Sequence, residues 1–114
     1  MNVRLDRLKV LIVDDNKHTR VLLAQILRAL GITQTIEASD GVEGLAALRS
    51  HAVDIVLTDL AMEPMNGIEF VRSLRTGPDS LGPMLPVIMI TGHATMKRLQ
   101  EARDAGVNEF MGKP

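Results

Sequence analysis

The stretch KVLIVDD at residues 9–15 decides the fold, because a short apolar run rich in β-branched residues ends directly in two acids. Runs of this length and composition are typical of strands that are buried on both faces of a parallel sheet. The pattern returns in IVLTD at residues 55–59, which again ends in an aspartate. Three further strands are predicted at residues 35–38, 87–91 and 109–112.

Helical patterns fill the segments between the predicted strands. Leu23, Ile26, Leu27 and Leu30 recur at the spacing of one helix face, and Gly31 is a suitable residue for ending that helix. The other helices are expected after the capping residues Asp40 and Asn66 and over residues 96–105. Strands that alternate with helices predict a doubly wound α/β domain, in which helices cover both faces of a parallel sheet.

The composition excludes several classes of protein. Lys and Arg number 13 against 14 Asp and Glu, and this balance gives no electrostatic footprint for nucleic acid or an anionic membrane. No cysteine is present, so disulfides and thiolate metal sites are excluded. No apolar stretch is long enough for a signal peptide or a membrane span. We therefore expect residues 1–114 to form one domain located in the cytoplasm.

Acidic side chains follow two of the predicted strands, at the sheet edge where sites of such folds lie. Asp14, Asp15 and Asp59 would repel one another there, unless a cation compensates their charge. Mg²⁺ is the natural cation for an all-oxygen site that also receives a phosphate. Thr91 and Lys113 end two other strands, where a hydroxyl and a positive charge would suit a phosphoryl group. The simpler alternative is that each aspartate only caps the helix that follows it.

The chain resembles the response-regulator receiver family of bacterial two-component signalling over its entire length. The motifs that carry the resemblance are Val13-Asp14-Asp15, Asp59-Leu60-Ala61-Met62, Met65-Asn66-Gly67, Ile90-Thr91-Gly92 and Lys113-Pro114. Each motif follows a predicted strand, and the combination at these spacings is specific where any one motif is weak. The resemblance implies a flavodoxin-like sheet of five parallel strands in the order 2-1-3-4-5.

The resemblance also implies a function, which is a phosphoacceptor signalling switch and not an enzyme that turns over a substrate. Asp59 would accept a phosphoryl group from a phosphohistidine on a histidine kinase or a histidine phosphotransfer protein. The residues expected to hold Mg²⁺ are Asp15, Asp59, the backbone carbonyl of Ala61 and, through a metal-bound water, Asp14. Lys113 would contact the phosphoryl group, and the Lys113–Pro114 peptide bond is expected to be cis.

Thr91 and Phe110 match the family's two-state switch. Thr91 would move toward the phosphoryl group, and Phe110 would then turn into the space that it leaves. The simpler interpretation of Phe110 is that it fills the core, as aromatic residues usually do. Ala61 and His93 match positions that tune hydrolysis of the acyl phosphate in the family.

Two features depart from the family pattern. Glu63 occupies the position where the family generally has proline, and Pro64 follows it. The chain given stops at Pro114, where the family continues into a fifth helix. Without that helix we expect apolar side chains of the first, fourth and fifth strands to be exposed, and this face to promote self-association.

Three other functions are alternatives to the switch. A phosphohydrolase of the haloacid-dehalogenase type needs a second acid two residues after the nucleophile, where this chain has Ala61. A flavodoxin-like FMN carrier needs a phosphate-binding loop after the first strand, where Asp14 and Asp15 would repel phosphate. A receiver-like module without phosphorylation would not need Thr91 and Lys113 beside the acids.

Overall fold

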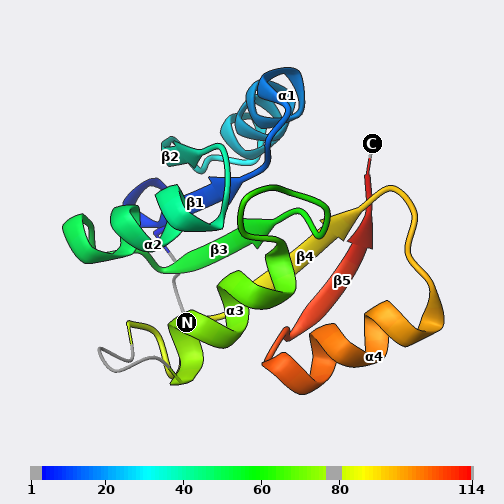
Figure 1. The fold of residues 1–114 in the computed structure, drawn as a ribbon. Helices are drawn as coiled ribbons and strands as arrows, with labels where there is room; N and C mark the ends of the chain where they lie inside the picture. The colour runs from blue at the N-terminus through cyan, green and yellow to red at the C-terminus, as the bar shows by residue number, and fades with distance from the viewer. Residues whose placement is uncertain (1–3, 77–80, 114) are drawn as a thin grey trace.

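The structure is a computed structural model that describes residues 4–76 and 81–113. Five parallel strands form one sheet in the order β2-β1-β3-β4-β5, so the predicted fold is confirmed (Figure 1). The strands are β1 (Lys9–Val13), β2 (Gln34–Ala38), β3 (Ile55–Thr58), β4 (Val87–Thr91) and β5 (Glu109–Gly112). The order reverses between β1 and β3, so the carboxyl ends of these two strands meet at the switch point of the sheet.

Helices cover both faces of the sheet, as Figure 1 shows. After a short 3₁₀ helix (Leu5–Arg7), the helices are α1 (Lys17–Ala29), α2 (Gly41–Ser50), α3 (Gly67–Thr76) and α4 (Met96–Ala105). Helix α1 lies on one face, and α2, α3 and α4 lie side by side on the other. None of the helices in the described part of the chain is long and apolar enough to cross a membrane.

Predicted caps define two of the helix starts. The Asp40 side chain accepts a hydrogen bond from the Glu43 backbone N–H (3.0 Å), and Glu43 accepts one from the Ser39 N–H (3.0 Å). Asn66 and Glu69 form the same reciprocal pair at the start of α3. These caps satisfy backbone donors that a helix start would otherwise leave unpaired.

Two hydrophobic clusters fill the space between the sheet and its helices. The larger lies under α2, α3 and α4 around Phe70 and Leu11, and the smaller packs α1 against the sheet through Leu23. Ile26 and Leu30, which the periodicity placed on the same helix face as Leu23, are exposed in the structure. The buried face of α1 is narrower than predicted because α1 contacts the sheet mainly through β1.

The expected exposure of the α1 face of the sheet is wrong for most of its side chains. Val10 and Ile12 of β1 are 1% exposed and Ile90 of β4 is 5% exposed, because residues of α1 and Ile32 pack over them. Only Met111 of β5, at 56% exposure, follows the expectation clearly.

Arg75 joins three segments at the amino ends of β4 and β5. Its guanidinium donates hydrogen bonds to the carbonyl oxygens of Gly82 (2.7 Å) and Gly106 (2.8 Å) and to Asn108 Oδ1 (2.9 Å). Asn108 Oδ1 also accepts a bond from the Val87 N–H (2.8 Å), so both strands begin from one hydrogen-bonded junction. Burial lowers the pKa of Arg75. Its hydrogen bonds lie at the end of the sheet opposite to Asp14 and Asp59, so they hold the strands together and do not contribute to the acidic site.

Candidate functional site

Three carboxylates meet at the carboxyl ends of β1 and β3. One oxygen from each of Asp14, Asp15 and Asp59 lies within 4.8 Å of the other two, and we call these residues the acidic cluster. Parallel pairing of Val13 with Thr58 sets the two strand ends side by side, and the Asp59 N–H donates to the Val13 carbonyl (2.8 Å). The structure therefore brings together the acids that the sequence predicted at adjacent strand ends.

Burial differs within the acidic cluster. Asp14 and Asp59 are only 2% and 5% exposed, whereas Asp15 faces solvent. The Asp14 carboxylate accepts a bond from the Asn16 N–H (2.8 Å), and Asp59 Oδ1 accepts one from the Leu60 N–H (2.8 Å). The second oxygen of each buried acid remains directed toward the interior of the site.

Lys113 supplies a positive charge to those two oxygens. Its Nζ lies 3.2 Å from Asp14 Oδ2 and 3.2 Å from Asp59 Oδ2. Its backbone N–H donates to the Thr91 carbonyl (3.2 Å), which fixes the residue just beyond the end of β5. The ammonium group thus occupies the position between the buried acids, where a cation is needed to offset their repulsion.

The pKa values in the site reflect this crowding. Burial, and then the negative charge of Asp14, raise the pKa of Asp59 above its usual range, and Lys113 opposes the shift only in part. For Lys113, burial alone would lower the pKa, but the hydrogen bonds and charges of Asp59 and Asp14 outweigh it, so the pKa is raised. Asp59 is therefore a carboxylate whose ionised form depends on neighbouring positive charge.

The donor set of the acidic cluster fits Mg²⁺. All three groups offer carboxylate oxygens, one acid is open to solvent, and Mg²⁺ binds through a few carboxylates while it keeps several waters. The carboxylates are close enough that a divalent ion would relieve a repulsion that Lys113 offsets only in part. Ala61 follows Asp59 by two residues and lies in the same loop.

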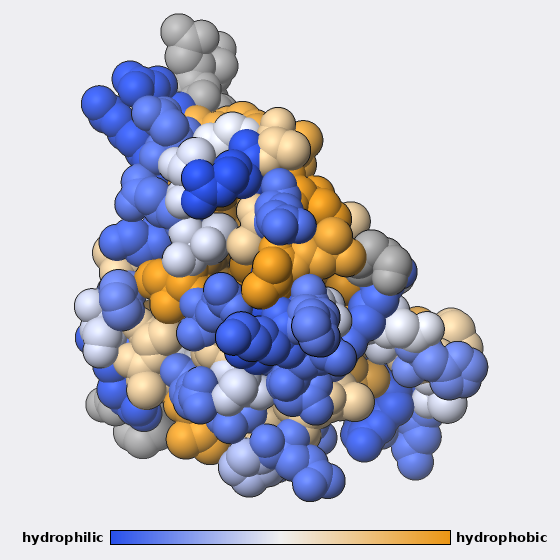
Figure 2. All heavy atoms as spheres, turned by 90° about the horizontal axis from the view of Figure 1, so that it is seen from above, coloured by the Kyte–Doolittle hydropathy of each residue, from blue (hydrophilic) through white to orange (hydrophobic). Residues whose placement is uncertain are grey.

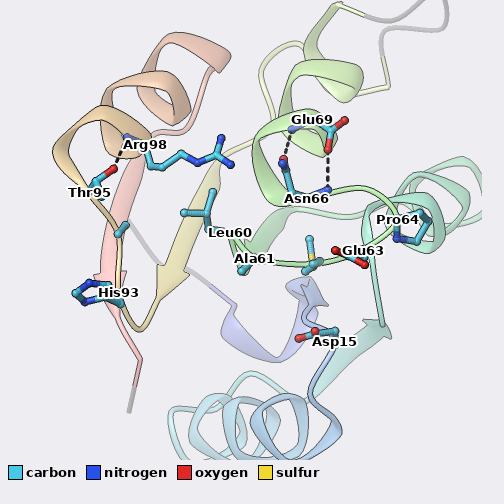
Figure 3. A pocket seen from close by; sticks show the side chains of 12 residues that line it. Asp15, Leu60, Ala61, Glu63, Pro64, Asn66, Glu69, His93, Thr95 and Arg98 are labelled. Atoms are coloured by element: carbon cyan, nitrogen blue, oxygen red, sulfur yellow. Dashed lines mark hydrogen bonds between the residues drawn. The ribbon is translucent and has the colours of Figure 1, made fainter.

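A cavity of about 880 Å³ opens next to the acidic cluster, and we call it the entrance cavity. Its walls are the loop after β3, the start of α3, and the loop after β4 with the start of α4. Figure 3 shows Glu63 and Pro64 on one side, His93 and Arg98 on the other, and Asp15 at the end near β1. Of the three acids in the acidic cluster, Asp15 lines this cavity.

Thr91, His93 and Phe110 lie around a second, smaller cavity of about 220 Å³. The Thr91 hydroxyl donates to the His93 carbonyl oxygen at 3.4 Å, a long bond. Phe110 is half-buried, and the Arg103 guanidinium carbon lies 5.6 Å from the centre of its ring. The structure therefore places Thr91 and Phe110 on the walls of one open cavity.

Some features of the site could not be read from the sequence. Arg98 lines the entrance cavity because Thr95 caps α4 and sets its first turn beside the loop after β3. A cis peptide bond is present between Glu63 and Pro64. The cis bond predicted between Lys113 and Pro114 lies outside the described residues.

Comparisons with known proteins agree with this geometry. Residues 10–114 match the family model described as the response regulator receiver domain. The chain is 41% identical over 107 residues to the chemotaxis protein CheY of Pseudomonas aeruginosa, covering 94% of this chain and 85% of that protein. Chemotaxis protein CheY4 of Vibrio cholerae superimposes with a TM-score of 0.85 at 31% identity, covering 94% of this chain and 87% of CheY4. CheY in a CheX–CheY–BeF₃–Mg²⁺ complex from Borrelia burgdorferi gives 0.84 at 29% identity, covering 94% and 78%.

Proposed function

Because this chain belongs to the response-regulator receiver family, we propose that it is a signalling switch whose Asp59 accepts a phosphoryl group. The resemblance predicted from the motifs is thereby confirmed at the level of the family. The observation that carries the proposal is the acidic cluster with Lys113 bound between its two buried members. The donor would be a phosphohistidine on a histidine kinase or a histidine phosphotransfer protein of the cytoplasm.

The positions of the side chains support the following phosphoryl transfer. An oxygen of Asp59 attacks phosphorus, the bond from phosphorus to the donor imidazole nitrogen breaks, and its electron pair stays on that nitrogen. Lys113 lies within reach of the same carboxylate and so can hold a phosphoryl oxygen after transfer. Catalysis of this kind consists mostly of positioning and neutralisation of charge.

We assign the Mg²⁺ site to Asp15, Asp59 and the backbone carbonyl of Ala61, with Asp14 acting through a bound water. Mg²⁺ would supply positive charge to the phosphoryl oxygens during transfer. The exposed position of Asp15 supports this assignment, because it leaves one side of the cluster open to solvent and ligand.

We propose that Thr91 and Phe110 form the two-state element that reports phosphorylation. Their shared cavity and the long hydrogen bond of Thr91 support a side chain that is free to move. Ala61 and His93 lie beside the entrance cavity, and we propose that they tune hydrolysis of the acyl phosphate. Exchange of both residues without any change in the dephosphorylation rate would contradict this role.

The test of the function is incubation with Mg²⁺ and acetyl phosphate, followed by intact mass measurement. We expect one phosphoryl group on the wild type and none on Asp59→Asn. Uptake by Asp59→Asn, or no uptake by the wild type with any phosphoryl donor, would refute the assignment. Continuous release of phosphate from added phosphate esters would favour a phosphohydrolase, and retention of the phosphoryl group favours the switch.

We also propose that residues 1–114 form one receiver domain that self-associates through its α1 face. Figure 2 views the molecule from that side and shows apolar surface gathered beside polar side chains. The exposed large apolar residues of α1 and β5 are Val21, Leu22, Ile26 and Met111. Sedimentation velocity over a range of concentrations tests this, and a monomer at every concentration would refute it.

A further inference from the structure

Glu63 places an uncompensated negative charge in the entrance cavity. Its side chain is exposed and lines the cavity together with Asp15 and Ala61. Across residues 4–76 and 81–113, no hydrogen bond or ion pair engages the Glu63 carboxylate. Figure 3 shows it on the loop after β3, at one side of the entrance cavity.

The other charged side chains that line the cavity have partners, apart from Asp15, which is the proposed Mg²⁺ ligand. Glu69 accepts a hydrogen bond from the Asn66 N–H (3.1 Å) at the start of α3. Arg98 is ion-paired with Glu101 at 3.1 Å, so its charge is partly neutralised. Lys113 is bound between the buried acids and cannot serve the cavity at the same time. With Mg²⁺ on Asp15, Glu63 is the cavity carboxylate without a partner among the described residues, and it adds a negative charge to the outer part of the cavity.

This bias distinguishes two classes of phosphoryl donor by the charge of the group that leaves. With acetyl phosphate, the phosphorus–oxygen bond breaks and its electron pair leaves on acetate, which is an anion. With phosphoramidate, the phosphorus–nitrogen bond breaks and its electron pair leaves on nitrogen, which departs as neutral ammonia with its three protons. In both reactions an oxygen of Asp59 forms the new bond to phosphorus. A departing group that passes through the entrance cavity meets the charge of Glu63, which disfavours the first reaction more than the second.

We infer that Glu63 is a specificity-determining residue, which favours donors with a phosphorus–nitrogen bond over acyl phosphates. The inference rests on the proposed function, because it concerns the group that leaves when Asp59 is phosphorylated. A donor histidine that is protonated on its other ring nitrogen belongs to the favoured class, since its imidazole leaves as a neutral group.

The test compares initial rates of phosphorylation by acetyl phosphate and by phosphoramidate at fixed Mg²⁺, using intact mass. Glu63→Gln should raise the ratio of the acetyl phosphate rate to the phosphoramidate rate about threefold, and Glu63→Lys should raise it further. Glu109→Gln is the matched control, because Glu109 is an exposed glutamate at the opposite end of the sheet. The control should leave the ratio unchanged.

A second measurement needs no variant. Added salt should raise the same ratio in the wild type and have less effect in Glu63→Gln, since salt screens the exposed carboxylate. An unchanged ratio in Glu63→Gln, or an equal change in Glu109→Gln, would overturn the inference while leaving Asp59 as the acceptor. No phosphorylation of the wild type by either donor would overturn the proposed function itself.

Discussion

Replacement of Gly67 by alanine should damage the loop that positions Asp59. A Cβ atom at residue 67 would overlap the backbone carbonyl oxygen of Asp59, closer than real Cβ atoms approach, and would also lie 3.0 Å from the Met89 methyl group. The methyl group is the flexible end of a side chain and can move aside. The carbonyl belongs to the backbone of Asp59, the proposed phosphoacceptor, and it cannot move aside in the same way. The loop after β3 or the start of α3 must therefore shift.

The magnitude follows from three contributions. Overpacking of this kind costs about 1–3 kcal/mol, and loss of the 2.8 Å hydrogen bond from the Gly67 N–H to the Leu60 carbonyl costs about 1 kcal/mol. The greater helix propensity of alanine offsets at most about 1 kcal/mol, and less at the first residue of a helix. We therefore expect the free energy of unfolding to fall by about 2–3 kcal/mol, which lowers Tm by about 10 °C in a chain of this size.

Thermal and urea denaturation followed by circular dichroism measure this effect. Gly112→Ala is the matched control, because a Cβ atom at residue 112 has nothing within 4 Å, and its Tm should stay within about 2 °C of wild type. Phosphorylation of Gly67→Ala below its Tm should also be slower than that of wild type. A Gly67→Ala variant as stable as the wild type would show that the contact with Asp59 does not constrain the loop.

Three further predictions test the charges of the site and of a helix cap. Lys113→Met should raise the pKa of Asp59 further, because the ionised carboxylate loses its nearest positive charge. Phosphorylation measured by intact mass should then be slower by about tenfold or more, and an unchanged rate would contradict the proposed role of Lys113. Mg²⁺ at about 100 times its Kd should stabilise the wild type by about 2.7 kcal/mol, which is measured as a rise in Tm that EDTA reverses. The rise should be smaller in Asp15→Asn, and an equal rise in Tm in both proteins would exclude Asp15 as a ligand. The Ser39 backbone N–H lowers the pKa of Glu43 below its ordinary 4.5, so this cap stabilises the fold above about pH 4.5 and the contribution is lost as the pH falls through the pKa of Glu43 in the folded protein. Glu43→Gln should lower the free energy of unfolding by about 0.5 kcal/mol at pH 7 and by less near pH 3. A difference between variant and wild type that does not change with pH would refute the ionic contribution.

The strands could be predicted from the sequence because each is a short apolar run with a polar residue at its end. The predicted strand at 55–59 differs from β3 (Ile55–Thr58) by one residue, and the predicted strand at 35–38 begins one residue later than β2 (Gln34–Ala38). Asp40 and Asn66 were recognisable as caps because each is followed three residues later by a glutamate. These signals are local in the sequence, and the structure contains the strands and caps that they predict.

Packing between distant segments could not be predicted in the same way. Periodicity identified the apolar face of α1 but not how much of it the sheet covers, so the exposure of Ile26 and Leu30 was missed. The acidic cluster was predictable because topology alone brings the ends of β1 and β3 together. The role of Arg98 as a wall of the entrance cavity depends on the tilt of α4 against a loop, which no local pattern encodes.

The junction at Arg75 has a mechanical consequence for the strands that bear Thr91 and Lys113. One guanidinium and one amide side chain fasten the roots of β4 and β5, so these roots have little freedom to separate. At the opposite ends, the Lys113 N–H donates a hydrogen bond of 3.2 Å to the Thr91 carbonyl, Thr91 lines an open cavity, and the Lys113 ammonium is held by the two buried acids. The amino ends of β4 and β5 are therefore held together more firmly than a strand pair without such a junction. A change in the charge between the acids and Lys113 would therefore act on the carboxyl ends of β4 and β5, while the Arg75 junction holds their amino ends in place.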